Sequence, residues 1–482
     1  MVSPESVIWN PANTNFDGAK FSKDRNRISY PHMDSLEAVN TSSLSVLRQK
    51  SNYLYDNGGF FGGMINTAAR ESGGQIPKSA SGDTDWDRLA DEIFIQATES
   101  AEIFDIGGEE DWFSMQEKVF VEQDKSGDGA IVLVGGNAFP QIALREGHQI
   151  SNAARPDSAN FDQKRWTNGL FLDRNNKVQK YRFVDGERHT DLERRDVVFY
   201  GNMERIRQRR GLPATYRMLN RMQDVNEIIK FMSVGVKSRN AVAFVWEGLT
   251  GAENVASLGD RLNEQPAAGA DDVDKITKDE VMNGTKIPKL PKGGKLDFLK
   301  DDRPGPNQIE FLDYLLRDMA WGYGVPVEVV WNLAALSSAN TRTVIRSYNG
   351  FIDRRRKWFR KKIGSRLRNW IIARAIQDGR LGLPQGGKWW RHNWIGGPLA
   401  TADFAKDMRV MLEALNRGEL SEDEFSAWRG SDRTVTDENH VRAVKERIAL
   451  CEREGVPFSY AYPKASGTQW NIEEFRESLI DE

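Results

Sequence analysis

The sequence predicts a helix-rich α+β fold, and three observations support this. Segments at 212–238 and 306–323 place apolar residues every three or four positions, the period of one buried helix face. Between 130 and 200, short apolar runs rich in β-branched and aromatic residues are separated by turn-forming residues, which is typical of strands. Region 341–380 combines an apolar helical period with thirteen Lys or Arg against two Asp. It predicts a long basic helix.

The first 42 residues predict an extended N-terminal arm. They are rich in Asn, Ser, Asp and Pro, and carry isolated aromatic residues at Trp9, Phe16, Phe21 and Tyr30. Two readings stay open for this arm. It is either a disordered terminus or a segment that lies across a neighbouring subunit with the aromatic side chains as anchors.

Region 43–211 predicts an α+β unit. Helical structure is expected at 43–71, broken by Gly58-Gly59 and Gly62-Gly63, and helices are expected at 85–104 and 111–123, with Asp85 as the N-cap of the first of these two. The period then changes from helical to two. The expected strands are 130–134, 141–144, a hairpin of 170–172 and 178–184 around the turn 173–176, and 196–200.

Two long helices are expected to flank a small module. The first spans 212–239 and has Pro213 in its first turn, where proline is favoured. The second spans 306–325 and ends at Gly324-Val325-Pro326, because proline cannot continue a helix. Between them, residues 240–305 predict an α/β or β module with strands at 242–246, 285–290 and 295–299. Its polar, acidic stretch 248–284 predicts a mobile insertion.

A loop is expected at 326–341, and its segment 331–340 contains no charged residue. The long basic helix and the segment that follows it occupy 342–400. Most charge runs are solvated helix faces, yet Trp358, Phe359 and Ile363 give this helix a strong apolar side. Its positive face therefore has two possible partners: the phosphates of DNA, or acidic segments of an adjacent subunit. Subunit contacts are favoured for most of these residues and DNA for a minority.

The C-terminal region 401–482 predicts a helical, acidic unit, with eighteen Asp or Glu against eleven Lys or Arg. A helix is expected at 403–416. Ser421 and Glu424 have the spacing of a capping box that opens a further helix. The last fifty residues are charged and only weakly periodic.

The sequence shows no constellation that predicts catalysis. The five histidines are not paired at metal-ligand spacing, and the single cysteine, Cys451, gives no disulfide or zinc framework. No catalytic residue, metal or cofactor is predicted. The chain also lacks an apolar run long enough for a membrane span, so an intracellular, soluble protein is expected.

Several ordered motifs resemble the lambda-type family of phage portal proteins. They include Arg210-Gly211-Leu212-Pro213 before a long helix, and Arg303-Pro304 before a second helix. The second helix carries Arg317 and leads to Gly324-Val325-Pro326. A Ser- and Asn-rich loop with Ser337-Ser338 follows, and then a helix beginning near Arg342. Arg48, Asn52, Asn57 and Gly58 fall near the places of an arginine- and asparagine-bearing helix that opens the folded part of these proteins. The resemblance covers roughly residues 43–450 and is most specific at 207–236 and 302–345.

The resemblance implies a subunit with a wing, a two-helix stem and a small α/β clip. The wing corresponds to 43–211, the stem helices to 212–239 and 306–325, and the clip to 240–305. The tunnel loop corresponds to 326–341, the basic helix and the return to the wing to 342–400, and a crown-like region to 401–482.

The family also implies a function without enzymatic activity. Twelve copies would form a ring at one capsid vertex, through which double-stranded DNA enters during packaging and leaves at infection. The implied partners are the large terminase, the major capsid protein and head–tail connector or adaptor proteins. The implied location is the virion, with assembly in the host cytoplasm.

Two sets of site residues follow from the resemblance and the charge pattern. The tunnel-loop residues expected at the DNA channel are Asn332, Ser337, Ser338, Asn340, Thr341 and Arg342. The basic-helix residues expected at a subunit interface or at DNA are Arg346, Arg354, Arg355, Arg356, Lys357, Arg360, Lys361 and Lys362.

Two other function classes were weighed. A different head–tail connector or adaptor ring protein is disfavoured by the chain length and by two long helices around a small module. A nucleic-acid enzyme holding DNA on the basic helix would need a metal or nucleophile cluster, which the sequence does not show.

Overall fold

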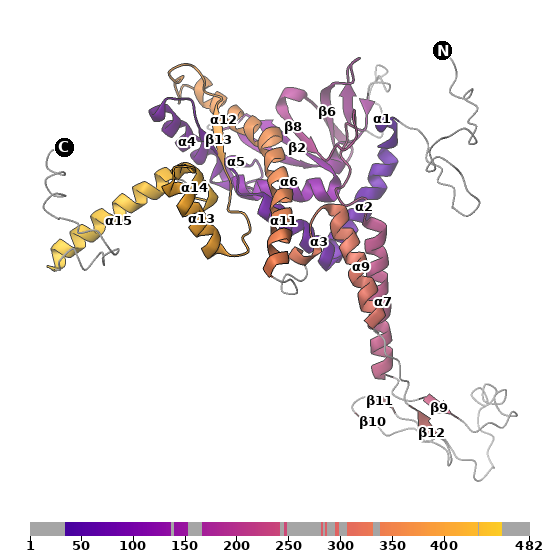
Figure 1. Ribbon diagram of the computed structural model, residues 1–482. Helices are drawn as coiled ribbons and strands as arrows, with labels where there is room; N and C mark the ends of the chain where they lie inside the picture. The colour runs from indigo at the N-terminus through magenta and orange to yellow at the C-terminus, as the bar shows by residue number, and fades with distance from the viewer. Residues whose placement is uncertain are drawn as a thin grey trace, which may run out of the picture.

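Three parts of different shape make up the chain: a body of helices and small sheets, a two-helix rod that leaves the body, and an arm of C-terminal helices (Figure 1). The structure is a computed structural model. It describes residues 34–135, 139–152, 166–241, 306–330, 338–431 and 433–455, and the short strands at 245–247, 281–282, 285–286 and 295–297.

The N-terminal helices begin at capping side chains. Asn40 accepts a hydrogen bond from the Ser43 amide, and Asp83 accepts one from the Trp86 amide. Asp111 and Ser114 form a reciprocal capping box. The helices of this part are α1 (Ser35–Ala38), α2 (Thr41–Asn57), α3 (Gly59–Ser72), α4 (Thr84–Thr98), α5 (Ala101–Phe104) and α6 (Trp112–Ser126).

The expected break at Gly58-Gly59 is confirmed, because Gly58 has an extended backbone between α2 and α3, whereas Gly62-Gly63 does not interrupt α3. Two other expectations are wrong in this part. The expected helix 85–104 is two helices, α4 and α5, because Ser100 has an extended backbone between them. Asp83 rather than Asp85 caps α4; Asp85 lies in the first turn, where a carboxylate still suits the helix dipole.

Two antiparallel sheets follow. β2 is the centre of a three-stranded sheet and pairs Ile131 with Leu144 on β3 and with Val198 on β8. The predicted hairpin is confirmed as β5 and β6, which belong to a four-stranded sheet of order β4-β5-β6-β7. The strands are β2 (Asp128–Val134), β3 (Gln141–Glu146), β4 (Trp166–Thr167), β5 (Leu170–Leu172), β6 (Val178–Asp185), β7 (Arg188–Glu193) and β8 (Val197–Gly201), with 3-10 turns η4 (Gly147–Gln149) and η5 (Arg194–Asp196).

Strand β7 was not predicted. It is an edge strand with mostly exposed polar and charged side chains, so it lacks the apolar alternation that marks a strand in sequence. Charged edge positions of this kind protect a sheet from pairing with other chains.

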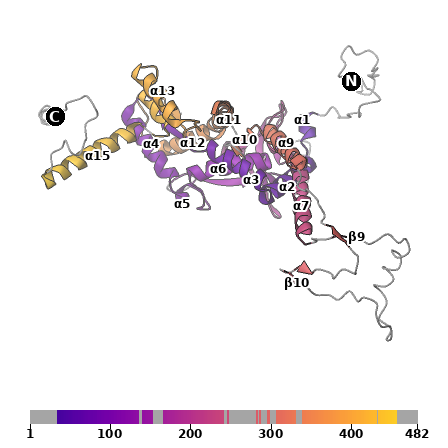
Figure 2. The same ribbon diagram turned by 60° about the horizontal axis from the view of Figure 1, so that its bottom comes forward.

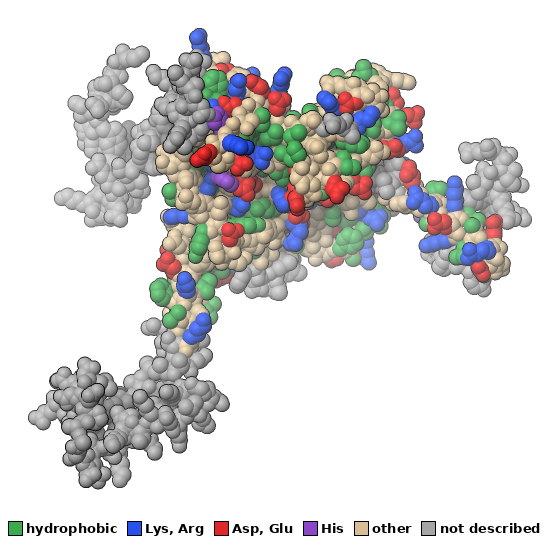
Figure 3. All heavy atoms as spheres, turned by 180° about the vertical axis from the view of Figure 1, so that it is seen from behind, with side chains coloured by type: hydrophobic (Ala, Val, Ile, Leu, Met, Phe, Trp, Pro, Cys, Tyr) green, Lys and Arg blue, Asp and Glu red, His purple; other side chains and the backbone are tan. Residues whose placement is uncertain are grey.

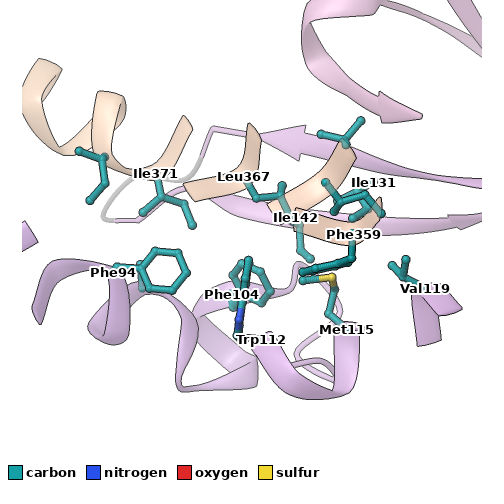
Figure 4. Packing of buried hydrophobic residues seen from close by; sticks show 14 of the residues in the cluster. Phe94, Phe104, Trp112, Met115, Val119, Ile131, Ile142, Phe359, Leu367 and Ile371 are labelled. Atoms are coloured by element: carbon teal, nitrogen blue, oxygen red, sulfur yellow. The ribbon is translucent and has the colours of Figure 1, made fainter. Parts of the chain in front are cut away.

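One long helical spine crosses the body. It consists of α11 (Ser338–Phe359), the π-helical turn η7 (Arg360–Gly364) and α12 (Ser365–Gln377). The spine buries Phe359, Leu367 and Ile371 against the helices and the central sheet (Figure 4). Trp112 on α6 lies at the centre of this core, with its ring centroid 6.1 Å from that of Phe359. The basic helix predicted from sequence is therefore also a core helix.

The π-helical turn faces a small two-stranded sheet formed by β1 (Ile76–Ser79) and β13 (His392–Ile395). A Cβ atom added to Gly364 would lie 2.2 Å from a ring carbon of Trp394. The π-helical turn therefore ends at a glycine that has no side chain to overlap the ring of Trp394.

The rod consists of α7 (Leu219–Ala241) and α9 (Pro306–Tyr323), which run side by side away from the body (Figures 1 and 2). At its root, Met222 and Val225 of α7 share a buried cluster with Met319 and Tyr323 of α9. Arg221 and Asp318 form an ion pair between the two helices. The predicted second long helix is confirmed, and Gly324, with φ of 98°, ends it before α10 (Val327–Val330).

The first long helix was predicted to begin at 212, seven residues before α7 begins at Leu219. Residues 214–218 form turns, in which the Tyr216 amide donates to the Pro213 carbonyl and the Met218 amide to the Thr215 carbonyl. Pro213 therefore precedes this turn segment instead of lying in the first turn of α7.

At the far end of the rod, the structure describes four short strands. β12 (Lys295–Asp297) pairs with β9 (Val245–Glu247), and β10 (Val281–Met282) pairs with β11 (Thr285–Lys286). β9, β11 and β12 overlap the three predicted strands of this module. The predicted insertion 248–284 lies outside the described residues except for β10.

The C-terminal arm consists of α13 (Phe404–Asn416), α14 (Glu422–Trp428) and α15 (Arg433–Glu454). The capping box is confirmed, because the Ser421 amide donates to the Glu424 carboxylate and the Glu424 amide donates to the Ser421 hydroxyl. Helix α15 lies in the region predicted to be helical, but its many charges leave only a weak apolar period, and its bounds were not predicted. The predicted N-terminal arm lies outside the described residues, except for its last residues.

Candidate functional site

The structure describes four of the six predicted tunnel-loop residues, and all four lie in helix α11. This helix begins at Ser338, three residues before the predicted start at Thr341. Residues 338–341 contain neither Gly nor Pro, so nothing in the sequence stops the helix from extending back to Ser338. Asn332 and Ser337 lie outside the described residues. The predicted loop is further shortened at its other end by α10.

Helix α11 distributes its cations over two faces. The buried side chains Ile345, Tyr348, Ile352 and Phe359 face the body. The exposed side of α11 and of the first turn of η7 carries a set that we call the cationic stripe: Arg342, Arg346, Arg354, Lys357 and Lys361. Successive members are three, four or eight positions apart, so they share one helix face. Lys362 is exposed as well, beside this stripe.

Arg355 does not belong to the cationic stripe. Its guanidinium donates to both carboxylate oxygens of Asp124 on α6, at 2.9 and 2.8 Å, and to the Ser72 hydroxyl on α3 at 2.8 Å. The Tyr323 hydroxyl of the rod donates to the same carboxylate at 2.6 Å. Side chains of α3, α6, α9 and α11 therefore join in one hydrogen-bonded cluster around the buried carboxylate of Asp124.

The protonation states of this cluster are fixed by its burial and charges. Burial works to lower the pKa of Arg355, but the charge of Asp124 outweighs it, so the pKa is raised. Burial, followed by the negative charge of Asp124, raises the pKa of Tyr323 well above its usual range. The cluster thus holds a charged Arg355 and a neutral Tyr323.

Arg356 and Arg360 also point into the body. Arg356 donates to the carbonyls of Glu71 and Gly397, each at 2.7 Å, and Arg360 donates to the Gln75 side-chain oxygen at 2.7 Å. Burial lowers the pKa of both guanidinium groups. These contacts, like those of Arg355, serve the fold of the subunit, so the structure removes these three arginines from the exposed set expected at DNA or at a neighbour.

A second charged cluster lies fully inside the body and was missed by the sequence reading. Arg48 of α2 donates to Asp128 at 2.7 Å, and Arg210 donates to both oxygens of the same carboxylate at 2.7 and 2.9 Å. The Gly211 amide adds a fourth bond at 2.7 Å. Asp128 has no solvent exposure. The motif residues Arg48, Arg210 and Gly211 were visible in sequence, whereas their common partner was not.

The rod exposes apolar side chains on two different faces. On α9, Phe311, Tyr314 and Trp321 follow one another along the exposed side, and Trp321 is 83% exposed. On α7, Phe231 is 75% exposed and Val234 is 55% exposed. Figure 3 shows hydrophobic side chains on the surface of the rod, from behind. Contiguous exposed apolar surface is often a contact surface in proteins.

The described residues show no catalytic or metal-binding arrangement. They contain no group of three or more His, Cys, Asp or Glu that could hold a metal ion. His392 shares a hydrogen bond of 2.9 Å with Ser365, while its other ring nitrogen contacts the Trp390 carbonyl, so no carboxylate completes a triad. None of the described helices combines the length and apolar character needed to cross a lipid bilayer.

The sequence profile of the family described as "Phage portal protein, lambda family" matches residues 24–355. No curated protein matches the chain. Among solved structures, a chain in the neck of an empty GTA particle is 10% identical, with a TM-score of 0.47; the alignment covers 81% of this chain and 94% of that one. A chain in the virion of a native gene transfer agent (GTA) particle is 11% identical, with a TM-score of 0.43 and coverage of 81% and 93%.

Proposed function

Since this chain belongs to the lambda family of phage portal proteins, we propose that it forms a dodecameric ring at one vertex of a capsid. Duplex DNA passes through the central channel during packaging and ejection. Proteins of this family are structural and not catalytic. The ATPase of packaging is then a separate protein, the large terminase.

One observation beyond the family carries this proposal: the rod with two unlike apolar faces. The exposed apolar faces of α7 and α9 differ in composition. In a head-to-tail contact, one face of a copy binds the other face of the next copy, so two unlike faces suit this arrangement. Such contacts close into a ring when the rotation between neighbours divides a full turn. Phe311 and Trp321 on α9 and Phe231 on α7 are the side chains that a ring would cover.

We assign the parts of the chain accordingly. The wing comprises 43–211 together with 342–400, the basic helix and its return to the wing. The spine in 342–400 packs on 43–211 through the ion pair at Asp124 and the apolar core around Trp112. The rod is the stem, and the strands beyond it belong to the clip, 240–305. The crown-like region is 401–482. In this assignment the clip docks the terminase and later the head–tail connector proteins, and the wing contacts the major capsid protein.

The first turn of α11 is proposed to contact DNA together with the loop that precedes it. Asn340 and Arg342 are exposed there. Amide and hydroxyl groups at a helix N-terminus attract phosphate through weak hydrogen bonds and the helix dipole. The preceding segment carries no charge, and a neutral surface avoids the friction that a ring of fixed cations would exert on a moving duplex.

A charge introduced at Asn340 tests this contact. We expect Asn340→Lys to slow DNA translocation in a packaging assay and to retain more DNA, because each copy adds a cation at the channel. The matched control is Asn175→Lys, which adds the same charge at an exposed turn of the wing. Equal translocation and retention for the two variants would remove this segment from the channel.

Ring formation itself is tested directly on the purified full-length chain. Negative-stain images should show rings with a central hole, and sedimentation should give a mass of several subunits. A monomer at concentrations up to those of an assembly reaction would contradict the proposed function.

A further inference from the structure

Two surfaces of the body carry opposite charge, and the described fold does not pair them with each other. The first is the cationic stripe of α11 and η7. Within 342–362 all exposed charged residues are Lys or Arg, and the nearest acid, Asp353, already pairs with Lys357 at 2.7 Å. The stripe therefore presents a surface of one charge.

The second surface, which we call the acidic face, belongs to α4, α5 and the turn after them. Its exposed acids are Asp85, Glu92, Glu99, Glu102 and Glu109. Arg88 is the single exposed base between 84 and 109. Exposed apolar side chains lie between the acids: Leu89, Ile95, Ile103 and Ile106.

The two surfaces look in different directions. Helix α4 buries Trp86, Ala90 and Phe94 toward the core that it shares with α12. Helix α11 buries its opposite side against α3 and the core. Figure 2 shows α11 and α5 on opposite sides of the body. The cationic stripe of a chain thus cannot reach its own acidic face.

We propose that the cationic stripe of one copy, from Arg346 to Lys361, binds the acidic face of the next copy, while Arg342 belongs to the proposed DNA contact. This inference rests on the proposed ring and names one of its contact surfaces. At about 1.5 Å per residue, the stripe from Arg346 to Lys361 is roughly 22 Å long, and the part of the acidic face on α4, from Asp85 to its C-cap Glu99, is roughly 21 Å long. In a head-to-tail ring every copy offers both surfaces, so each stripe and each acidic face is paired.

The composition of the acidic face favours a protein partner over DNA for the stripe. Exposed Ile and Leu side chains between carboxylates suit the aliphatic stems of Arg and Lys, which cover apolar surface while their charges meet the acids. The acidic face repels a duplex and attracts cations, so it is complementary to the stripe. One contact between copies satisfies both surfaces.

A charge-swap experiment tests this contact. The stripe variant is Arg346→Glu/Arg354→Glu/Lys361→Glu, and the face variant is Glu92→Lys/Glu99→Lys/Glu102→Lys. All six positions are exposed. We expect each variant alone to weaken self-association about a hundredfold, since it opposes like charges across the contact. Combining both sets in one chain restores opposite charges, and therefore restores rings. The control, Arg174→Glu/Arg188→Glu, reverses exposed cations on the four-stranded sheet.

The readouts are ring mass by native mass spectrometry and ring stability against salt, with circular dichroism to verify folding. If the stripe variant and the face variant each form rings at the concentration at which the unmodified chain does, the proposed contact is wrong, although the chain still forms a ring. Intact rings in the stripe variant with weakened binding of duplex DNA would also overturn it, because the stripe would then face DNA. Absence of rings in the unmodified chain would instead contradict the proposed function.

Discussion

Adjacent arginines on the spine have opposite roles. Arg354 is exposed on the cationic stripe, whereas Arg355 is bound to a buried carboxylate and lies 4.8 Å from the centre of the Phe120 ring. One helical step of 100° separates them, and this step decides which cation is structural. A buried ion pair of this kind is held by several hydrogen bonds, and breaking one partner leaves the other charge stranded.

Replacing Arg355 should therefore be far more costly than replacing its neighbour. We expect Arg355→Ala to lower the free energy of unfolding by about 3–5 kcal/mol, because Asp124 is left buried without its cation. Arg354→Ala, the matched control, should change it by less than about 0.5 kcal/mol. Guanidinium unfolding of both variants at one fixed protein concentration measures the difference. Similar losses for the two would show that the Asp124 cluster does not stabilise the body.

At the scale of elements, the spine combines a regular helix with one π-helical turn. Gly350 lies within α11 with open space around it, so its missing side chain weakens the helix without a packing reason. Gly364 lies at the π-helical turn, against Trp394. The two glycines look alike in sequence, and only the contacts around them distinguish their roles.

Alanine at these two positions should have opposite effects. We expect Gly350→Ala to raise the free energy of unfolding by about 0.5–1 kcal/mol, because alanine reduces the entropy lost on helix formation. Gly364→Ala should lower it by about 1–3 kcal/mol, since the added methyl group overlaps the Trp394 ring. Thermal unfolding followed by circular dichroism compares them, and the same sign of change for both would contradict the packing argument.

At the scale of the whole molecule, the rod is the part of the subunit that exposes large aromatic side chains along its length. Its inner sides pack in the cluster around Met222 and Met319, yet its outer faces present aromatic side chains to solvent. Interface energy concentrates in a few large aromatic residues, each worth about 2 kcal/mol or more when truncated. The rod is thus expected to contribute to assembly more than to the stability of the single subunit.

Removing two of these aromatics should separate assembly from folding. We expect Phe311→Ser/Trp321→Ser to dissociate the ring at concentrations where the unmodified chain stays assembled, while its helical content is unchanged. Tyr53→Ser provides the control, because Tyr53 is 64% exposed but lies on α2 outside the rod. Analytical ultracentrifugation with circular dichroism gives both readouts, and unaltered assembly of the rod variant would exclude these side chains from the contact.

Much of the architecture could be predicted from local patterns. The second rod helix, the Gly-Val-Pro stop, the hairpin at 170–184 and the capping box at Ser421 are each determined by residues close together in the chain. Errors arose where the local signal was weak or ambiguous. The turns before α7 resemble a first helical turn, β7 carries too many charges to show the alternation of a strand, and the charges of α15 hide where that helix begins and ends.

By itself, the sequence determined the α+β class, the approximate places of the long helices, and which family the chain belongs to. Only the tertiary structure decided what the charges do. Asp124 and Arg355 are 231 positions apart, and Asp128 and Arg210 are 82 apart. A helix face repeats within a few residues and is visible in any short window. The partner of a buried charge is brought in by the packing of distant segments, which no local period encodes.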